Sequence, residues 1–253
     1  MDGLKGKRAL ITGGSKGLGL AIAHALASKG CSLCLVARDR AALEQARQQL
    51  VDDHAVDVVV RAEDLSRPER ASALGADFPE TDILVNCAGA IGRGSLTELD
   101  PGAFRAAFDG KVMSTIMLTR ALYPDMCSRR SGVIINIIGI AGERLNPKSI
   151  GTTTANAALI AFTKALGAES VDYGVRVVGI NPGLIRTGRT ASLLDPKTER
   201  DRTAYASLLK NLPYGRMGEP SEVAAAALFL ASESATYISG EVLAVDAGSR
   251  FRM

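Results

Sequence analysis

The sequence predicts a single α/β domain in which a parallel sheet of about seven strands is covered by helices on both faces. Short apolar runs recur along the chain, at 8–12, 32–37, 56–61, 83–86, 132–138, 175–180 and 241–245. Longer amphipathic stretches lie between them, as at 17–29, 40–51, 101–126, 153–171 and 221–231. This alternation is typical of a doubly wound parallel sheet. A glycine-rich turn after the first run supports the same fold class.

The length and composition suit one domain over residues 1–253. Of the 253 residues 47% are hydrophobic, and we find no internal repeat, linker or low-complexity segment. The formal net charge is +3 and the Lys and Arg residues are scattered, which argues against a nucleic-acid partner. We also find no apolar run of about 18 residues and no secretory leader at the start, so a cytoplasmic protein without a membrane partner is expected.

The cysteines and histidines give no reason to expect a metal site. Cys31 and Cys34 form a C-x-x-C pattern, which occurs in redox and zinc sites. However, they lie in the apolar run 31–36, which reads as a buried strand, and no second cysteine pair accompanies them. We therefore expect two buried thiols. His24 and His54 are far apart in the sequence on helix-like segments, so neither is given a role.

The glycine-rich turn predicts a site for a dinucleotide. Residues 12–19 read T-G-G-S-K-G-L-G and lie between a predicted strand and a predicted helix. Glycines at such a turn let backbone N–H groups approach a pyrophosphate, and the helix N-terminus adds a favourable dipole. Glycines also occur in ordinary tight turns, but the strand before and the helix after favour the binding role. The expected contacts are Gly13, Ser15, Lys16, Gly17, Leu18 and Gly19.

The turn resembles the T-G-x-x-x-G-x-G motif of the short-chain dehydrogenase/reductase family, and the resemblance extends from about Lys5 to Gly248. Residues 86–89 look like the family's N-A-G motif, which stabilises the sheet beside the cofactor. Residues 181–187 look like its N-P-G-x-[IV]-x-T segment, which holds the carboxamide of the nicotinamide. The resemblance implies a Rossmann fold and further cofactor-binding residues: Asp64, Leu65, Asn86, Ala88, Gly89, Pro182, Gly183, Ile185 and Thr187.

The end of the second strand favours NADP(H) over NAD(H). A carboxylate at this position would bond the adenosine ribose and repel a 2′-phosphate. This chain has Ala37 followed by Arg38, and Lys16 lies inside the glycine turn. Two cations suit a phosphate. Asp39, one position later, leaves NAD(H) possible, and the alternative interpretation of Arg38 and Lys16 is two ordinary surface charges.

The resemblance fails at the family's catalytic group of Asn, Ser, Tyr and Lys. The positions that correspond to them hold Lys111, Gly139, Thr152 and Asn156. A threonine hydroxyl is far too weak an acid to replace an activated phenol near pH 7. The nearby hydroxyls at 149, 153 and 154 are expected to serve as caps or turn residues.

Two hypotheses follow for the catalytic positions. Lys and Asn have exchanged places, so Lys111 would restore a cation beside the nicotinamide ribose and Asn156 would position it; the other interpretation is drift, with Lys111 directed to solvent. The first predicts an NADP(H)-dependent oxidoreductase for a carbonyl or alcohol substrate with a non-standard proton relay that uses Lys111, Thr152 and Asn156. The alternative is a catalytically inactive dinucleotide-binding homologue that acts as a sensor, scaffold or partner subunit.

The remaining expectations concern the substrate and the assembly. A substrate lid is predicted at about 188–218, an irregular region with its own apolar residues Leu193, Leu194, Tyr205, Leu208 and Leu209. Basic residues on the surrounding loops would favour a small anionic substrate with an apolar part: Arg93, Arg144, Lys148, Arg186 and Arg189. Family members pair the helices that correspond to 101–126 and 153–171, which implies a homodimer or homotetramer.

Overall fold

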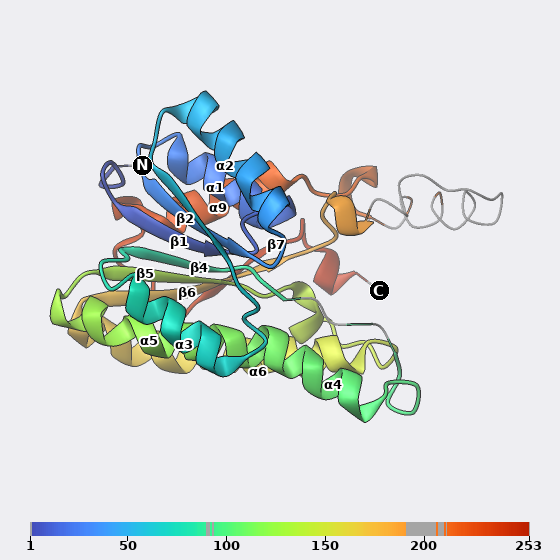
Figure 1. Ribbon diagram of the computed structural model, residues 1–253. Coiled ribbons are helices and arrows are strands. Elements are labelled where there is room, and N and C mark those ends of the chain that lie inside the picture. The colour runs from blue at the N-terminus through green and yellow to red at the C-terminus, as the bar shows by residue number, and fades with distance from the viewer. Residues whose placement is uncertain are drawn as a thin grey trace.

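A computed structural model describes residues 2–89, 92, 94–190, 206, 210 and 212–252. Over this part of the chain, seven parallel strands form one sheet in the order β3-β2-β1-β4-β5-β6-β7 (Figure 1). The order reverses between β1 and β4, and such a switch point at the carboxyl ends of the strands is where ligands bind in this architecture. The strands are β1 (Arg8–Thr12), β2 (Ser32–Ala37), β3 (Val58–Ala62), β4 (Ile83–Asn86), β5 (Gly132–Ile137), β6 (Val175–Pro182) and β7 (Val242–Val245).

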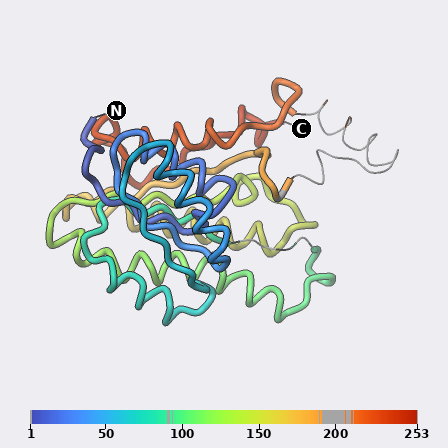
Figure 2. Tube along the Cα trace, turned by 45° about the horizontal axis from the view of Figure 1, so that its top comes forward, coloured from blue at the N-terminus to red at the C-terminus, as the bar shows by residue number. Residues whose placement is uncertain are grey.

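Helices cover both faces of the sheet, as the alternation of the sequence predicts. One face carries α1 (Gly17–Ala27), α2 (Arg40–His54) and α9 (Pro220–Ala231). The other carries α3 (Pro68–Asp77), α5 (Ser114–Ser128) and α6 (Ile150–Glu169), with α4 (Pro101–Phe108) beyond them (Figure 1). The red C-terminal helix α9 lies beside the blue α1 in both views, so the two ends of the chain share one layer (Figure 2).

Two apolar cores, one on each face, hold the helices against the sheet. Successive residues of a strand point to opposite faces: Ile11 of β1 packs in the core with α1 and α9, whereas Leu10 packs in the core with α3 and α5. Leu26 and Leu118 are fully buried on the two sides. Each such side chain contributes roughly 1.5–3 kcal/mol by burial. This packing fixes where α1 begins and therefore where the glycine turn lies.

The structure corrects the helix that the sequence predicts over 101–126. The segment is divided into α4, a π-helical turn at Asp109–Met113 and α5. A π-turn widens the helix locally and is frequent at functional sites. Here it buries both Lys111 and Val112. The short helix α3 was not predicted; it begins with Pro68, a favourable first helical residue.

The two cysteines of the C-x-x-C pattern, Cys31 just before β2 and Cys34 within it, are buried on opposite faces of the sheet, which confirms the expectation of buried thiols. Cys31 belongs to the core under α1 and α2, and Cys34 to the core under α3 and α5. Burial raises the pKa of Cys31 to about 11 and that of Cys34 to about 12, because a thiolate is poorly solvated there. The pair therefore cannot act as one redox or zinc unit.

We expect neither thiol to react with Ellman's reagent at pH 8 while the protein is folded. The measurement uses a background in which the half-buried Cys87 and Cys127 are replaced by serine. Two thiols should then appear only when denaturant is added. Rapid reaction of one thiol in the folded protein, removed by Cys34→Ser, would contradict the assigned burial.

Among the helices of the described residues, none is long and apolar enough to cross a membrane. The predicted lid is described only at its two ends, where Gly188–Thr190 and Pro213–Gly215 form short 3-10 turns. Its apolar residues Leu193, Leu194, Tyr205, Leu208 and Leu209 lie outside the described residues.

Candidate active site

The glycine turn joins the end of β1 to the start of α1, as predicted. Gly13 and Gly17 have φ angles of 67° and 59°, which L side chains rarely adopt. Gly19 has no room for a side chain, since an added Cβ would lie 2.3 Å from the Gly13 carbonyl oxygen. The glycines are therefore required by the close approach of the turn and the helix.

The first turn of α1 has the properties of an anion-binding site. The helix begins at Gly17, no side chain caps it, and its first turn contains no acidic residue. Its N–H groups thus keep their partial positive charge for an outside acceptor. Lys16, the residue before the helix, is exposed and adds a full charge. This arrangement suits a pyrophosphate.

The motif after β4 is tied to the turn and to Lys111. The Thr12 hydroxyl accepts hydrogen bonds from the N–H groups of Cys87 and Ala88, both at 2.9 Å. A Cβ added to Gly89 would lie 2.8 Å from the Cβ of Lys111. Because Gly89 has no side chain, the Lys111 side chain can lie directly against its backbone.

Two of the predicted cofactor contacts use their side chains elsewhere. The amide of Asn86 is buried and donates to Asn136 Oδ1 at 2.9 Å and Thr119 Oγ1 at 3.2 Å, so it stabilises the sheet. Leu65 is buried in the core with Leu74. Either residue can reach a ligand at this edge through its backbone alone.

The end of β2 presents one cation, Arg38, and the nearby carboxylates of Asp39 and Asp64 both accept hydrogen bonds from other groups. Arg38 is exposed. Asp39 accepts a hydrogen bond from the Ala42 N–H at 3.1 Å and caps α2, so its side chain serves the helix. The Ser66 hydroxyl and N–H donate to Asp64 at 2.8 and 3.1 Å and hold its pKa below the usual range, and Arg38 lowers it further.

The structure brings Lys111 and Asn156 together. Lys111 Nζ donates to Asn156 Oδ1 at 2.6 Å and to the Ile138 carbonyl at 2.7 Å. Asn156 Nδ2 in turn donates to the Gly139 carbonyl at 3.1 Å. The Lys111 residue is only 9% exposed, so the interpretation in which it is directed to solvent is wrong. The π-turn, the loop after β5 and α6 therefore meet at one point.

The backbone at Gly139 is adapted to glycine. Its φ angle is 120°, and an added Cβ would lie 3.1 Å from Asn156 Nδ2. A serine at this position would be strained and would press on the amide that holds Lys111. The missing hydroxyl and the Lys111–Asn156 contact are thus parts of one local arrangement.

Thr152 lies in the first turn of α6, one helical turn before Asn156 and on the same face. It is half-buried. Of the hydroxyls expected to serve as caps or turn residues, Thr153 accepts from the Asn146 N–H at 3.4 Å in the turn before the helix. Thr154 instead donates to the Ile150 carbonyl at 2.8 Å inside the helix, and Ser149 is at the N-cap position but makes no side-chain cap hydrogen bond.

A polar network beside Gly139 was missed by the sequence analysis. Asn181, at the end of β6, accepts from the Gly139 N–H at 3.2 Å and donates to Glu143 Oε1 at 2.6 Å. The other Glu143 oxygen lies 3.2 Å from Arg250 Nε. Asn181 belongs to a motif, but Glu143 and Arg250 belong to none, so no local signal indicated them. The network holds the C-terminal turn against the site.

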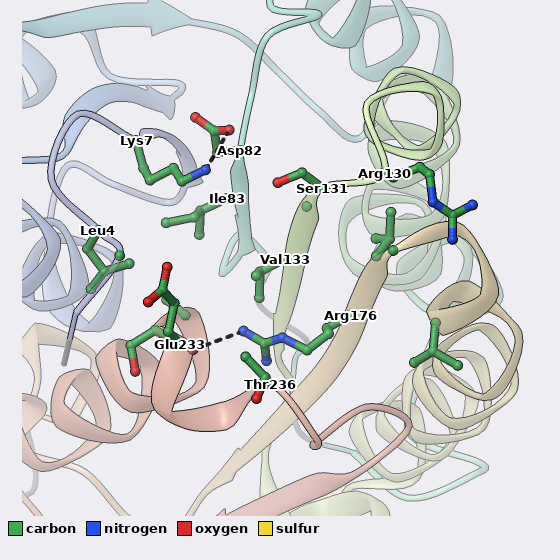
Figure 3. A pocket seen from close by; sticks show the side chains of 17 residues that line it. Leu4, Lys7, Asp82, Ile83, Arg130, Ser131, Val133, Arg176, Glu233 and Thr236 are labelled. Atoms are coloured by element: carbon green, nitrogen blue, oxygen red, sulfur yellow. Dashed lines mark hydrogen bonds and ion pairs between the residues drawn. The ribbon is translucent and has the colours of Figure 1, made fainter.

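The segment 181–187, which the resemblance assigns to the carboxamide of the nicotinamide, lies beside the glycine turn. A Cβ added to Gly17 would lie 3.7 Å from the Thr187 methyl. A cavity of about 100 Å³ adjoins the segment and is lined by Gly183, Ile185 and Glu222 among others. The larger cavity, of about 320 Å³, lies at the opposite edge of the sheet among Lys7, Asp82 and Arg176 (Figure 3).

The larger cavity is not the predicted site. Three of its charged side chains are already engaged: Lys7 Nζ lies 3.5 Å from Asp82 Oδ1, and Arg176 donates to the Ser232 carbonyl at 3.2 Å. It lies at the amino ends of the strands, whereas ligands of parallel α/β sheets bind outside the carboxyl ends.

The basic loops are described in part. Arg144 and Lys148 are exposed. Arg186 Nε lies 3.0 Å from Glu219 Oε1, so this cation is already paired. Arg93 and the side chain of Arg189 lie outside the described residues.

The chain is similar to characterised oxidoreductases over nearly its whole length. Residues 13–250 match a family model described as Enoyl-(Acyl carrier protein) reductase. A galactitol 2-dehydrogenase (L-tagatose-forming) of Cereibacter sphaeroides is 35% identical over 97% of this chain and 95% of its own. A 3-oxoacyl-[acyl-carrier-protein] reductase of Escherichia coli is 33% identical over 96% and 97%.

Solved structures agree with the sequence relatives. L-sorbose reductase from Gluconobacter frateurii, complexed with NADPH and L-sorbose, superposes with a TM-score of 0.93 at 34% identity and covers 100% of both chains. Together with the glycine turn, the motif after β4 and the segment 181–187, these likenesses cover the chain from end to end. The chain belongs to the short-chain dehydrogenase/reductase family of NAD(P)-dependent oxidoreductases.

Proposed function

We propose that the protein is an NADP(H)-dependent oxidoreductase that interconverts a carbonyl and an alcohol on a small molecule, with Lys111 and Asn156 in place of the family's usual catalytic group. The observation that carries the proposal is the buried Lys111–Asn156 pair. Burial of an ammonium is costly unless acceptors surround it, and such groups gather at functional sites. Drift after loss of activity would not select this arrangement.

The residues present fit NADP(H). Because Gly19 has no side chain, the start of α1 packs directly against the Gly13 backbone, and this keeps the N–H groups of the turn beside those of the helix N-terminus. The uncapped start of α1 and Lys16 would hold the pyrophosphate, and Arg38 the 2′-phosphate, since Asp39 is occupied as a helix cap. When bound, the nicotinamide supplies or accepts the hydride.

The protein's own residues would handle the proton and the charge. We assign the cation to Lys111 Nζ, which is fixed by Asn156 Oδ1 and the Ile138 carbonyl. Lys111 would supply the proton to the oxygen of the reduced carbon and take it back in the oxidation. The Thr152 hydroxyl, on the same helix face as Asn156, would hydrogen-bond the substrate oxygen and orient it rather than ionise.

The substrate class is proposed from the relatives and the loops together. Two of the similar proteins are named for a sugar or a polyol, L-sorbose and galactitol. Exposed Arg144 and Lys148 would also favour an acid. We therefore propose a small hydroxylated ketone or its alcohol as substrate, with acidic members of the class preferred.

Oxidation of NADPH in the presence of carbonyl compounds tests the proposal. The panel should contain neutral ketosugars, keto acids and β-keto esters, and binding of NADPH should be followed by its fluorescence. We expect binding and turnover with at least one hydroxylated ketone. Tight NADPH binding without turnover of any member would instead support a dinucleotide-binding homologue without catalysis.

Cofactor preference gives a sharper prediction. Arg38→Ala should weaken NADPH binding by roughly tenfold to a hundredfold, the range for one charge-assisted hydrogen bond, and leave NADH binding unchanged. The matched control is Arg40→Ala, which removes an exposed arginine from the start of α2 that lies 3.8 Å from Glu44. Fluorescence titration with both cofactors measures the ratio. Equal losses for NADPH and NADH would contradict the assigned role.

A further inference from the structure

Two histidines that are far apart in the sequence meet on the surface of the domain. His24 lies on α1 and His54 ends α2, and the two helices pack side by side on one face of the sheet (Figure 1). His24 Nδ1 is 3.1 Å from His54 Nε2 and 3.7 Å from Asp53 Oδ2. One ligand atom from each of the three residues lies within 4.8 Å of the others. Neither histidine has a role that the sequence alone indicates, because their positions differ by 30 residues.

These separations match those of ligands on one metal ion. At Zn–N distances of about 2.0–2.1 Å, two imidazole nitrogens on a tetrahedral ion lie about 3.3 Å apart, and their ring centroids about 5.2 Å apart. Here the nitrogens are 3.1 Å apart and the centroids 5.3 Å. A nitrogen and a carboxylate oxygen on the same ion lie about 3.4 Å apart, against 3.7 Å between His24 and Asp53. Small side-chain shifts would complete the geometry.

We propose that His24 Nδ1, His54 Nε2 and a carboxylate oxygen of Asp53 form a binding site for a divalent transition metal ion of the Zn²⁺ class. Two imidazoles and one carboxylate suit Zn²⁺, Co²⁺, Ni²⁺ and Cu²⁺ far better than Mg²⁺ or Ca²⁺. The side chains of His24 and Asp53 are 32% and 60% exposed, so an ion can enter from solvent and keep water as its fourth ligand.

The two imidazoles are already held in contact in the folded chain. A neutral imidazole has a free lone pair for a metal, whereas a protonated one has none. Without metal, one imidazole N–H donates to the other ring, and this hydrogen bond holds the two nitrogens at the required separation.

The site would act on stability rather than on catalysis. His24 lies about two helical turns from the glycine turn, and none of the three residues belongs to the proposed active site. An ion bound to both helices would tie α1, which carries the phosphate-binding turn, to α2. Because the ligands come together only in the folded chain, binding should raise Tm, and above Kd the increase should grow with the logarithm of the free metal concentration.

Calorimetric titration of the full chain with ZnCl₂ at pH 7.5 tests the proposal. The background should carry Cys87→Ser and Cys127→Ser, so that half-buried thiols do not bind the metal. We expect one equivalent of Zn²⁺ to bind, with affinity at least tenfold weaker in His54→Ala and in His24→Ala. The matched control is Asp52→Ala. Asp52 is next to Asp53 in the sequence, but its carboxylate accepts a hydrogen bond from Gln48. The Asp52→Ala variant should bind Zn²⁺ as the wild type does.

Two further measurements keep the proposal open to refutation. Asp53 is exposed, so Asp53→Asn should fold even where a histidine variant does not, and it should bind Zn²⁺ several-fold more weakly. Substituted Co²⁺ should give the visible absorption of a tetrahedral site in the wild type and lose it in His54→Gln. Absence of binding by the folded wild type, or binding indifferent to both His54 and Asp53, would overturn the assignment.

Discussion

Replacing Lys111 with methionine is expected to lower kcat for carbonyl reduction by roughly 10²–10⁴-fold, the usual contribution of a positioned proton donor. Methionine retains most of the buried stem and removes the ammonium. The hydrogen bonds to Asn156 Oδ1 and the Ile138 carbonyl are lost with it. Because Lys111 is assigned to the reacting oxygen and not to the phosphates, the Kd for NADPH should change much less than kcat.

Stability measurements separate a catalytic role from a structural one. Each buried acceptor left without a donor costs about 1–3 kcal/mol, so Lys111→Met should also lower the free energy of unfolding. Asn156→Leu should cause a similar loss of kcat, because Lys111 then loses its positioning partner. Lys164→Met, an exposed lysine on α6, is the control and should alter neither property. A Lys111 variant that is less stable but turns over at the wild-type rate would refute the relay.

The sequence was sufficient to identify Lys111 and Asn156 as the candidate catalytic pair, but not to predict how the two side chains are arranged. The exchange of Lys and Asn at 111 and 156 is visible in the family register. The burial of Lys111 is not, because it depends on the π-turn at Asp109–Met113 inside a segment that reads as one continuous helix. Gly139 was noted for a missing hydroxyl, whereas its φ of 120° shows that the backbone itself has adapted.

The contacts between elements could not be predicted from the sequence, and one reason accounts for all of them. Helical periodicity predicts which face of a helix is buried, but not how far one helix is displaced along its neighbour. The meeting of His24 with His54 depends on that displacement between α1 and α2. The Glu143–Arg250 ion pair likewise joins a loop after β5 to the C-terminal turn. The strands were easier to predict from the sequence, since the ends of an apolar run such as 32–37 can be recognised from the neighbouring residues alone.

The second large effect is expected at the phosphate-binding turn. Gly19→Ala would place a Cβ 2.3 Å from the Gly13 carbonyl oxygen and 2.7 Å from its carbon. Both contacts are with backbone, so no side chain can rotate away, and either α1 or the turn must move. Pyrophosphate binding requires the N–H groups of both α1 and the turn. A displaced site would lose several charge-assisted hydrogen bonds at once, so we expect NADPH affinity to fall by about a hundredfold or more.

A steric defect of equal size elsewhere distinguishes loss of the site from loss of the fold. A Cβ added to Gly75 of α3 would lie 2.3 Å from the Cβ of Ala121 on α5, on the sheet face opposite α1. Overpacking of this kind costs about 1–3 kcal/mol, so both variants should unfold at lower denaturant concentration. Gly75→Ala should nevertheless bind NADPH with wild-type affinity. If the two glycine variants bound NADPH equally well, the turn at 12–19 would not be the phosphate site, and the cofactor would have to be held elsewhere along the carboxyl edge of the sheet.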